Sequence, residues 1–286
     1  MNKERTIYMD YQASTPIHQS VLEAMMPYLT QDYGNPHSAE HIMGWNASKA
    51  IDNAKKKVAN AIGGQQEEII FTSGATEANN HAIVCMARAI RSHKKKILIG
   101  ATEHKCVIEA ARFASEQYDL SLEIIPVNNE GFIDIEAFKR LLDDDVGLVS
   151  VMLVNNEVGT IQDIKILTNL AKHHDVVFHC DAAQGMLALD VDVSDLGVDL
   201  LSLSAHKIYG PKGVGALFIS NGIINQIEPL IYGGSQQSGL RAGTLPTAQC
   251  VGFGSACESL VNMEEERARL RRLKKTFISN LAELTE

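Results

Sequence analysis

Short apolar runs that alternate with helical patterns are the feature of this sequence that most constrains its fold. Six such runs occur, at residues 69–71, 96–100, 148–154, 176–180, 199–203 and 215–219. Runs rich in Val, Ile and Leu that are separated by helices are typical of strands buried on both faces of a sheet. The pattern therefore predicts an α/β domain with a mostly parallel sheet.

Polar and ionisable residues follow five of these runs directly. They lie at residues 72–76, 103–104, 155–157, 181–184 and 204–207. In sheets of this kind, ligands bind beyond the carboxyl ends of the strands. We therefore expect these five segments, which are far apart in the sequence, to form one site.

Two of the segments have more than one interpretation when each is taken alone. The turn at Gly74, Ala75 and Thr76 has the backbone N–H groups and hydroxyl that an anion needs, but such a turn more often caps a helix that binds no ligand. Asp181 follows an apolar strand, so its carboxylate needs a cationic or hydrogen-bonded partner. A pyridinium nitrogen would serve, and so would a helix N-terminus. Gln184 could likewise bond a ring oxygen or a nearby loop.

The last segment contains a lysine that is suitably positioned for covalent chemistry. Lys207 follows a buried strand and precedes a turn rich in Gly and Pro. An amine in such a place can be partly desolvated, which favours its neutral, nucleophilic form. Ser204 and His206 could donate hydrogen bonds to a phosphate, and His104 could stack on an aromatic ring and exchange protons near neutral pH.

Composition excludes some other classes of function. The net charge of −9 argues against a nucleic-acid binder, and no C-x-x-C pair indicates a metal or disulfide framework among the five cysteines. We predict no metal site. The polar N-terminus does not resemble a signal peptide, and no apolar run is long enough to cross a bilayer. These features predict a cytoplasmic protein that binds neither nucleic acid nor membrane.

Seven motifs together resemble one family. They are YMDYQASTP at residues 8–16, GNPHS at 34–38, FTSGATE at 71–77, TEHK at 102–105, VNNEVG at 154–159, SAHKIYGPKG at 204–213 and RAGTLP at 241–246. In this order they resemble the cysteine desulfurases, in the class-V aminotransferase branch of fold-type I enzymes that use pyridoxal 5′-phosphate (PLP). The resemblance implies a mostly parallel seven-stranded sheet flanked by helices, with an incomplete small domain. It also implies a large domain over residues 15–258, with 1–14 and 259–286 as the remnant of the small domain.

The resemblance assigns a role to each candidate site residue. Lys207 would be the Schiff-base lysine, Asp181 the partner of the pyridine nitrogen, Gln184 the partner of the ring oxygen, and His104 the stacking, proton-transferring residue. Ala75, Thr76, Ser204 and His206 would hold the phosphate, and Asn156 would lie near the ring and the substrate. Thr244 would reach the phosphate in a partner subunit, which implies a homodimer. The implied reaction takes sulfur from L-cysteine and leaves alanine and an enzyme persulfide, for iron–sulfur cluster assembly or tRNA thiolation. An iron–sulfur scaffold or another sulfur-acceptor protein is the expected partner.

The sequence departs from the family pattern in its C-terminal part. The family's sulfur-accepting loop cysteine and substrate-carboxylate arginine are both missing, and Cys106, in a helical pattern, is expected to fill space. Three alternatives therefore stay open: a desulfurase whose missing part comes from elsewhere, a selenocysteine lyase or other PLP lyase, and a non-catalytic PLP-binding subunit. We expect the amphipathic stretch 259–284 to pack on the large domain, on a dimer partner or on a second polypeptide.

Overall fold

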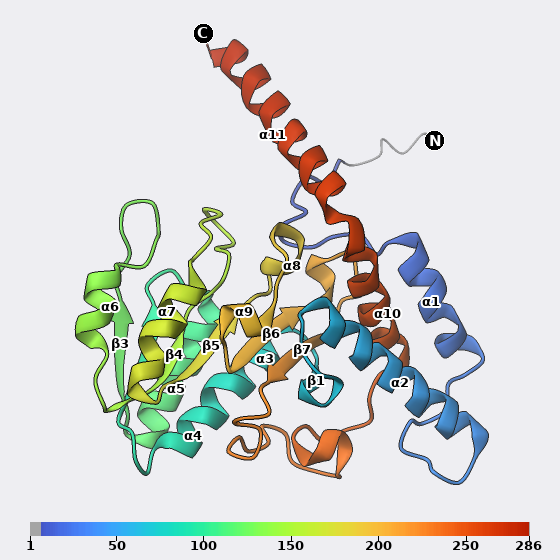
Figure 1. The fold of residues 1–286 in the computed structure, drawn as a ribbon. Helices are drawn as coiled ribbons and strands as arrows, with labels where there is room; N and C mark the ends of the chain where they lie inside the picture. Colours follow the sequence, from blue (N-terminus) through green and yellow to red (C-terminus); the bar gives the residue numbers. More distant parts are fainter. Residues whose placement is uncertain (1–6, 286) are drawn as a thin grey trace.

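A single seven-stranded sheet forms the centre of the chain, as seen in a computed structural model that describes residues 7–285 (Figure 1). Its strands are β1 (Ile69–Thr72), β2 (Lys96–Gly100), β3 (Ser121–Ile125), β4 (Val146–Ser150), β5 (Val177–Asp181), β6 (Leu200–Ser204) and β7 (Gly215–Ile219). The strand order is β1-β7-β6-β5-β4-β2-β3. All pairings are parallel except those of β7, which runs antiparallel to both β1 and β6. The predicted α/β fold with a mostly parallel sheet is confirmed.

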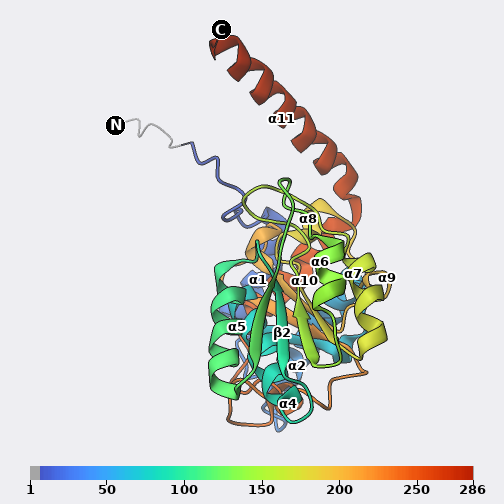
Figure 2. The same cartoon turned by 90° about the vertical axis from the view of Figure 1, so that its left-hand side faces the viewer.

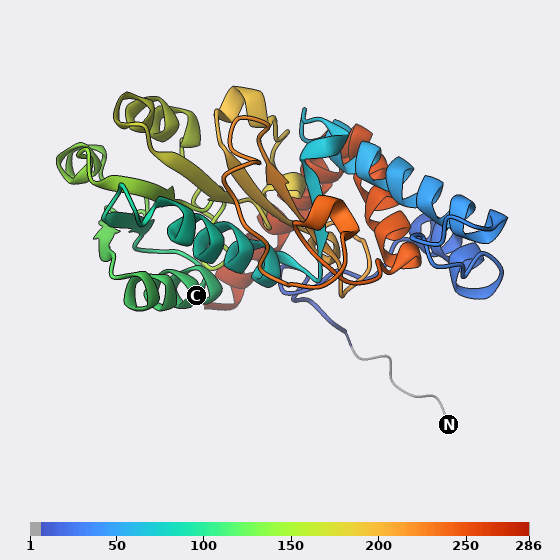
Figure 3. The same cartoon turned by 90° about the horizontal axis from the view of Figure 1, so that it is seen from below.

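The sheet is buried on both faces because its strands are apolar at successive positions. Along β1, Ile69 and Phe71 belong to one apolar cluster and Ile70 belongs to another. Successive side chains of a strand point to opposite faces. A continuous apolar run therefore supplies two cores at once, and helices cover both (Figure 3).

The helices divide between these two faces. One face carries α3 (Ala75–Asn80), α4 (Met86–Ile90) and α5 (Lys105–Tyr118), with a π-helical segment His81–Cys85 between α3 and α4. The other carries α2 (Ile42–Ala61), α6 (Ile135–Leu141), α7 (Ile164–Ala171), α9 (Val193–Leu196) and α10 (Thr247–Glu258), with α1 (Gln19–Thr30) beside α10. The short α8 (Gly185–Ala188) follows β5.

Strand β3 is the one strand that no continuous apolar run marks in the sequence. It lies at the edge of the sheet and pairs with β2 alone. Ser121 and Ile124 are exposed, and Ile125 is buried. A strand at an edge does not need two apolar faces, so its sequence mixes polar and apolar residues.

The last helix, α11 (Met263–Thr285), projects away from the rest of the chain (Figure 2). Its first turns are attached: Arg267 donates to the Leu187 carbonyl oxygen at 2.9 Å and pairs with Asp190, and Tyr209 donates to Glu266. Leu273 and Phe277 are 52% and 57% exposed. Packing along the large domain was one of three predicted positions for this stretch, and α11 does not adopt it. Packing on a second subunit or polypeptide stays a prediction.

Among the helices of residues 7–285, none has the length and apolar character needed to span a bilayer.

Candidate active site

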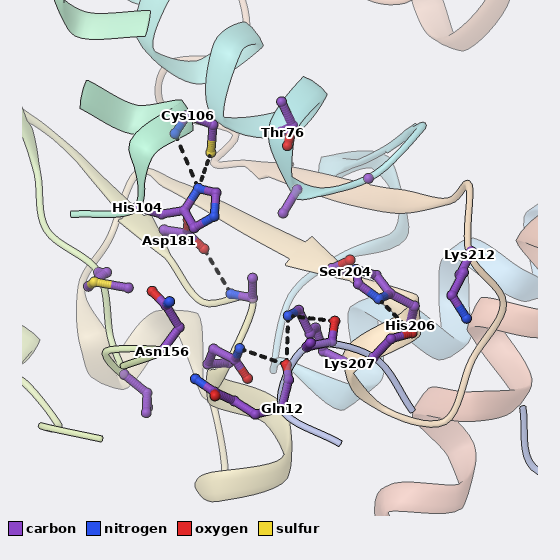
Figure 4. A pocket seen from close by; sticks show the side chains of 18 of the residues that line it. Gln12, Thr76, His104, Cys106, Asn156, Asp181, Ser204, His206, Lys207 and Lys212 are labelled. Carbon is purple, nitrogen blue, oxygen red and sulfur yellow. Dashed lines mark hydrogen bonds between the residues drawn. The ribbon is translucent and has the colours of Figure 1, made fainter. Parts of the chain in front are cut away.

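A cavity of about 790 Å³ opens at the ends of the strands, where the polar segments of the sequence converge (Figure 4). Residues that follow β1, β2, β4, β5 and β6 line it, together with the segment that precedes β7 and residues near the N-terminus. Nine of the ten predicted site residues line this cavity: Ala75, Thr76, His104, Asn156, Asp181, Gln184, Ser204, His206 and Lys207.

The turn between β1 and α3 is shaped by a glycine and by a partly buried ion pair. Gly74 has a φ of +151°, a conformation that residues with a side chain rarely adopt. Glu77, in the first turn of α3, accepts from the Ser73 N–H at 2.8 Å and pairs with Arg241 at 2.8 Å. Burial opposes ionisation of Glu77, but the bonds from Arg241 and Ser73 lower its pKa overall. The turn is thereby fixed to the loop that contains Arg241.

Lys207 lies in a 3-10 turn directly after β6 and points into the cavity. Its Nζ donates to the backbone oxygens of Gln12 at 2.7 Å and Ala13 at 3.1 Å. Desolvation lowers the pKa of this amine, while Asp10 and Asp181 oppose the shift. Lys207 is therefore a half-buried amine that is more easily deprotonated than an ordinary surface lysine.

Asp181 ends β5 and is 4% exposed. Its Oδ1 accepts from the Ala183 N–H at 2.9 Å, and its Oδ2 accepts from Asn79 Nδ2 at 2.7 Å. Burial nevertheless raises the pKa of the carboxyl group, and the two hydrogen bonds only reduce that shift. A cationic group in the cavity would stabilise the carboxylate form.

His104 caps the N-terminus of α5 through one ring nitrogen. Its Nδ1 accepts from the Cys106 N–H at 3.2 Å and lies 3.0 Å from Cys106 Sγ. A nitrogen that accepts from a backbone N–H carries no proton of its own. In the neutral imidazole of His104, the proton is therefore on Nε2.

Ser204 is the last residue of β6, and His206 lies in the 3-10 turn that follows. Ser204 Oγ is buried, lines the cavity and has no hydrogen-bond partner among the described residues. His206 Nδ1 is 3.3 Å from Ser14 Oγ. Desolvation lowers the pKa of His206, and the nearby positive charges of Lys207 and Lys212 lower it further. This part of the cavity therefore has an unpaired hydroxyl and an excess of positive charge, a combination suited to an anion.

Of the remaining predicted residues, Gln184 and Asn156 line the cavity and Thr244 does not. Gln184 Nε2 donates to the Gln12 carbonyl oxygen at 3.2 Å, and Asn156 donates to Glu157 at 2.7 Å. Thr244 is exposed and does not line the cavity of its own chain. Its predicted contact is with a partner subunit, so the prediction for Thr244 stays open.

Several residues of this site are not among those predicted from the sequence. Asp10, Gln12 and Ser14 line the cavity, and their position within the YMDYQASTP motif could have indicated this. Lys212 also lines it, and its position within the SAHKIYGPKG motif could have indicated this. Cys106, which we expect to fill space in a helix, is partly exposed and forms part of the cavity wall.

Glu103 follows β2 as predicted but lies behind the cavity rather than in its wall. It is 6% exposed, and its Oε1 accepts from the Met152 N–H at 2.7 Å. Burial raises the pKa of this carboxyl group well above its usual value. Its position indicates a structural role in joining the ends of β2 and β4.

The fold and a lysine-bearing cavity at the strand ends define a class of cofactor-dependent α/β enzyme, and comparisons with known proteins identify the family. Residues 7–286 match the Aminotransferase class-V family. The chain is 46% identical over 276 residues to cysteine desulfurase IscS of Rickettsia prowazekii (strain Madrid E), covering 96% of this chain and 67% of the relative. A solved NifS-like protein superposes with a TM-score of 0.93 at 37% identity, over 97% of this chain and 76% of the other. A solved structure described as SspA in complex with cysteine has a TM-score of 0.84 at 41% identity, over 88% and 72%.

The chain therefore belongs to the aminotransferase class-V family, and within it to the cysteine desulfurases. This family depends on PLP, and the residues present fit that group. Ser204 has an unpaired buried hydroxyl where a phosphate oxygen could accept its proton. Asp181 is a buried carboxyl with no ion-pair partner among residues 7–285, and Lys207 has a partly desolvated amine.

Proposed function

We propose that this chain is a PLP-dependent cysteine desulfurase, which transfers sulfur from L-cysteine to a thiol. In that reaction the C–S bond of cysteine breaks, a sulfur–sulfur bond to the acceptor thiol forms, and a proton is added to carbon to give L-alanine. The observation that carries the proposal is the presence of three groups in one cavity: the Lys207 amine, the buried Asp181 carboxyl and the unpaired Ser204 hydroxyl. A relative of similar fold is described as a complex with cysteine.

Each predicted residue has a task in holding the cofactor. Lys207 would bind PLP through Nζ, Asp181 would pair with its ring nitrogen, and Gln184 would bond its ring oxygen. Ala75, Thr76, Ser204 and His206 would bind the phosphate, and Asn156 would face the ring and the substrate. When bound, PLP supplies an electron sink for charge that develops on the substrate.

Lys207 and His104 would carry out the proton transfers. Lys207 must leave the backbone oxygens of Gln12 and Ala13 before its amine can react. Its lowered pKa favours the neutral form that this requires. His104 would donate or hold a proton at Nε2, because Nδ1 is occupied by hydrogen bonds from Cys106.

Four of the five cysteines are unsuited to accept the sulfur. Cys85, Cys180, Cys250 and Cys257 are buried, and burial raises the pKa of each thiol, to about 12 for Cys85 and Cys250. A thiol reacts as its thiolate, so these groups are inert near neutral pH. The acceptor in this proposal is a thiol other than these four.

The assembly and setting of the protein are parts of the same proposal. We infer a homodimer in which Thr244 reaches the partner subunit's phosphate site, and a cytoplasmic protein that supplies sulfur to an iron–sulfur scaffold or to tRNA thiolation. We also assign residues 15–258 to a large domain, and the flanking 1–14 and 259–286 to a small one. Residues 1–6 and 286 of that division lie outside the described part of the chain.

The visible absorption spectrum of PLP-supplemented protein, before and after L-cysteine, tests the proposed function. We expect a band from lysine-bound PLP that changes on addition of cysteine, with alanine formed in the presence of an added thiol. The Lys207→Ala variant serves as the control and should lack the band. Alanine from selenocysteine but not from cysteine would instead favour a selenocysteine lyase. A stable band without turnover of either substrate would favour a non-catalytic PLP-binding subunit.

A further inference from the structure

A chain of side-chain hydrogen bonds joins Asp181, at the end of β5, to His104, which caps α5. Asn79, in α3, is 0% exposed, and its Nδ2 lies 2.7 Å from Asp181 Oδ2 and 3.2 Å from Cys106 Sγ. Cys106 Sγ in turn lies 3.0 Å from His104 Nδ1 (Figure 4). Asn79 and Cys106 thus connect Asp181 to His104.

The direction of each hydrogen bond follows from the donors that are available. His104 Nδ1 already accepts from the Cys106 N–H, so the Cys106 thiol must be the donor to that nitrogen. Cys106 Sγ then accepts one amide hydrogen of Asn79, and Asp181 Oδ2 accepts the other. Each hydrogen is used once, and no two donors or acceptors face each other.

We propose that Asn79 and Cys106 are positioning residues, which fix the Asp181 carboxylate and the His104 imidazole relative to each other through one hydrogen-bonded chain. The inference rests on the proposed function for its consequence, because Asp181 and His104 are the groups assigned to the ring nitrogen and to proton transfer. The contacts themselves do not depend on that assignment.

The side chain of Cys106 is suited to this role because it both donates and accepts. Cys106→Ala would leave one Asn79 amide hydrogen without its acceptor, and would remove the thiol donor from His104 Nδ1, which would keep only the backbone N–H of residue 106. A serine would keep a donor and an acceptor. Unpaired buried polar groups are costly, and the neighbouring groups would move to find new partners.

The reactivity of Cys106 in the cofactor-free protein tests the contacts directly. Cys106 is the one partly exposed cysteine of the five, so iodoacetamide should label it first, and the Cys106→Ala variant identifies its signal by mass spectrometry. Burial raises the pKa of this thiol and the bond from Asn79 opposes that shift. We expect Asn79→Leu, which removes both amide hydrogens, to move the pH midpoint of labelling up by about one unit.

Two titratable groups face the Cys106 thiol, Asp181 on β5 and His104 at the start of α5. Both are present in wild type and in Asn79→Leu. An unchanged labelling profile in folded Asn79→Leu would overturn the proposed chain. If Asn79→Leu does not fold, the same comparison is made with Asn79→Ser, which is too short to reach both partners.

The functional consequence is tested with PLP-loaded variants. We expect Cys106→Ala to lower kcat for L-cysteine about tenfold with less than about a twofold change in PLP affinity, and Cys106→Ser to restore most of the loss. Asn79→Leu should weaken PLP binding about tenfold, because Asp181 loses one of its two donors. Wild-type kcat in Cys106→Ala would contradict the positioning role, and equal losses in Cys106→Ser and Cys106→Ala would reduce Cys106 to a space-filling residue.

Failure of this inference and failure of the proposed function give different results. A wild-type protein that does not act on cysteine contradicts the proposed function, while the labelling of the cofactor-free protein still decides whether the chain of hydrogen bonds exists.

Discussion

At the scale of single residues, Ser204 carries a direct prediction about the phosphate site. Its buried hydroxyl has no hydrogen-bond partner within the described part of the chain, and a phosphate oxygen would supply one. We expect Ser204→Ala to weaken PLP binding by about tenfold, the value of one hydrogen bond to a charged group. Absorbance titration with PLP measures this, with Ser194→Ala, at an exposed position, as the control. Equal PLP affinities of the two variants would contradict the assignment of Ser204.

Residues of the site differed in how far they could be predicted from the sequence. Asp181, Ser204 and Lys207 were predictable because they directly follow apolar runs, and the ends of parallel strands meet at one edge of the sheet. The contact of Lys207 with Gln12 was not predictable. It joins a side chain to a backbone oxygen 195 residues away, and a backbone oxygen leaves no mark on residue type.

At the scale of elements, the ion pair between α3 and the loop after β7 stabilises the turn that would hold the phosphate. The side chains of Glu77 and Arg241 are only 12% and 17% exposed. Removing one partner of this partly buried pair leaves a charge on the other without its hydrogen-bonded counter-ion. We expect Glu77→Gln to lower the free energy of unfolding by about 2 kcal/mol, as measured by urea denaturation.

The control for that change is Glu109→Gln, which breaks a half-exposed pair with Arg112 within α5. Such surface pairs contribute less than about 1 kcal/mol. Similar losses in the two variants would mean that burial does not strengthen the pair between Glu77 and Arg241.

Three neighbouring strands meet at one buried histidine. His179 on β5 lies between Ser150 Oγ on β4 at 2.8 Å and Ser202 Oγ on β6 at 3.0 Å, and burial lowers its pKa from 6.5 to about 3. Below pH 6.5 the unfolded chain therefore binds a proton at His179 that the folded chain does not bind, so stability falls as the pH decreases.

We expect this histidine to reduce the free energy of unfolding by about 2 kcal/mol between pH 6.5 and pH 5. Urea denaturation at both pH values, in wild type and in His179→Gln, measures the effect, and the variant should lose that part of the pH dependence. His173→Gln, at an exposed position, is the control. Identical pH dependence in wild type and His179→Gln would show that His179 is not held neutral.

The elements themselves were predictable where burial is two-sided. The strands β1, β2, β4, β5, β6 and β7 coincide with apolar runs, because each has helices or loops packed on both faces. The run at residues 148–154 continued past the end of β4, since Val151 to Val154 remain buried after the strand pairing stops. Hydrophobicity reports burial, and it cannot by itself locate the end of a strand.

At the scale of the whole molecule, the exposed position of Thr244 leads to a test of subunit sharing. If Thr244 reaches the phosphate of the partner subunit, each site takes Lys207 from one subunit and Thr244 from the other. Lys207→Ala and Thr244→Glu then inactivate residues that different subunits contribute to the same site. The glutamate would repel the phosphate. A mixed dimer of the two variants would contain one site in which both residues are intact.

We expect each variant alone to be inactive, and an equal mixture, refolded together, to recover about a quarter of the wild-type desulfurase activity. The quarter arises because half of the dimers are mixed and each has one intact site of two. A mixture without recovered activity would contradict the shared site. Full activity of Thr244→Glu alone would contradict it as well.

The central claim is that Lys207 binds PLP in this cavity, and reduction with borohydride followed by peptide mass spectrometry tests it most directly. Borohydride makes the bond between PLP and its lysine permanent, so the modified residue can be identified without any assay of activity. We predict that the cofactor mass is found on the peptide that contains Lys207, and that Ser204→Ala lowers its yield at limiting PLP. A label spread over surface lysines, with Lys207 unmodified, would contradict the account.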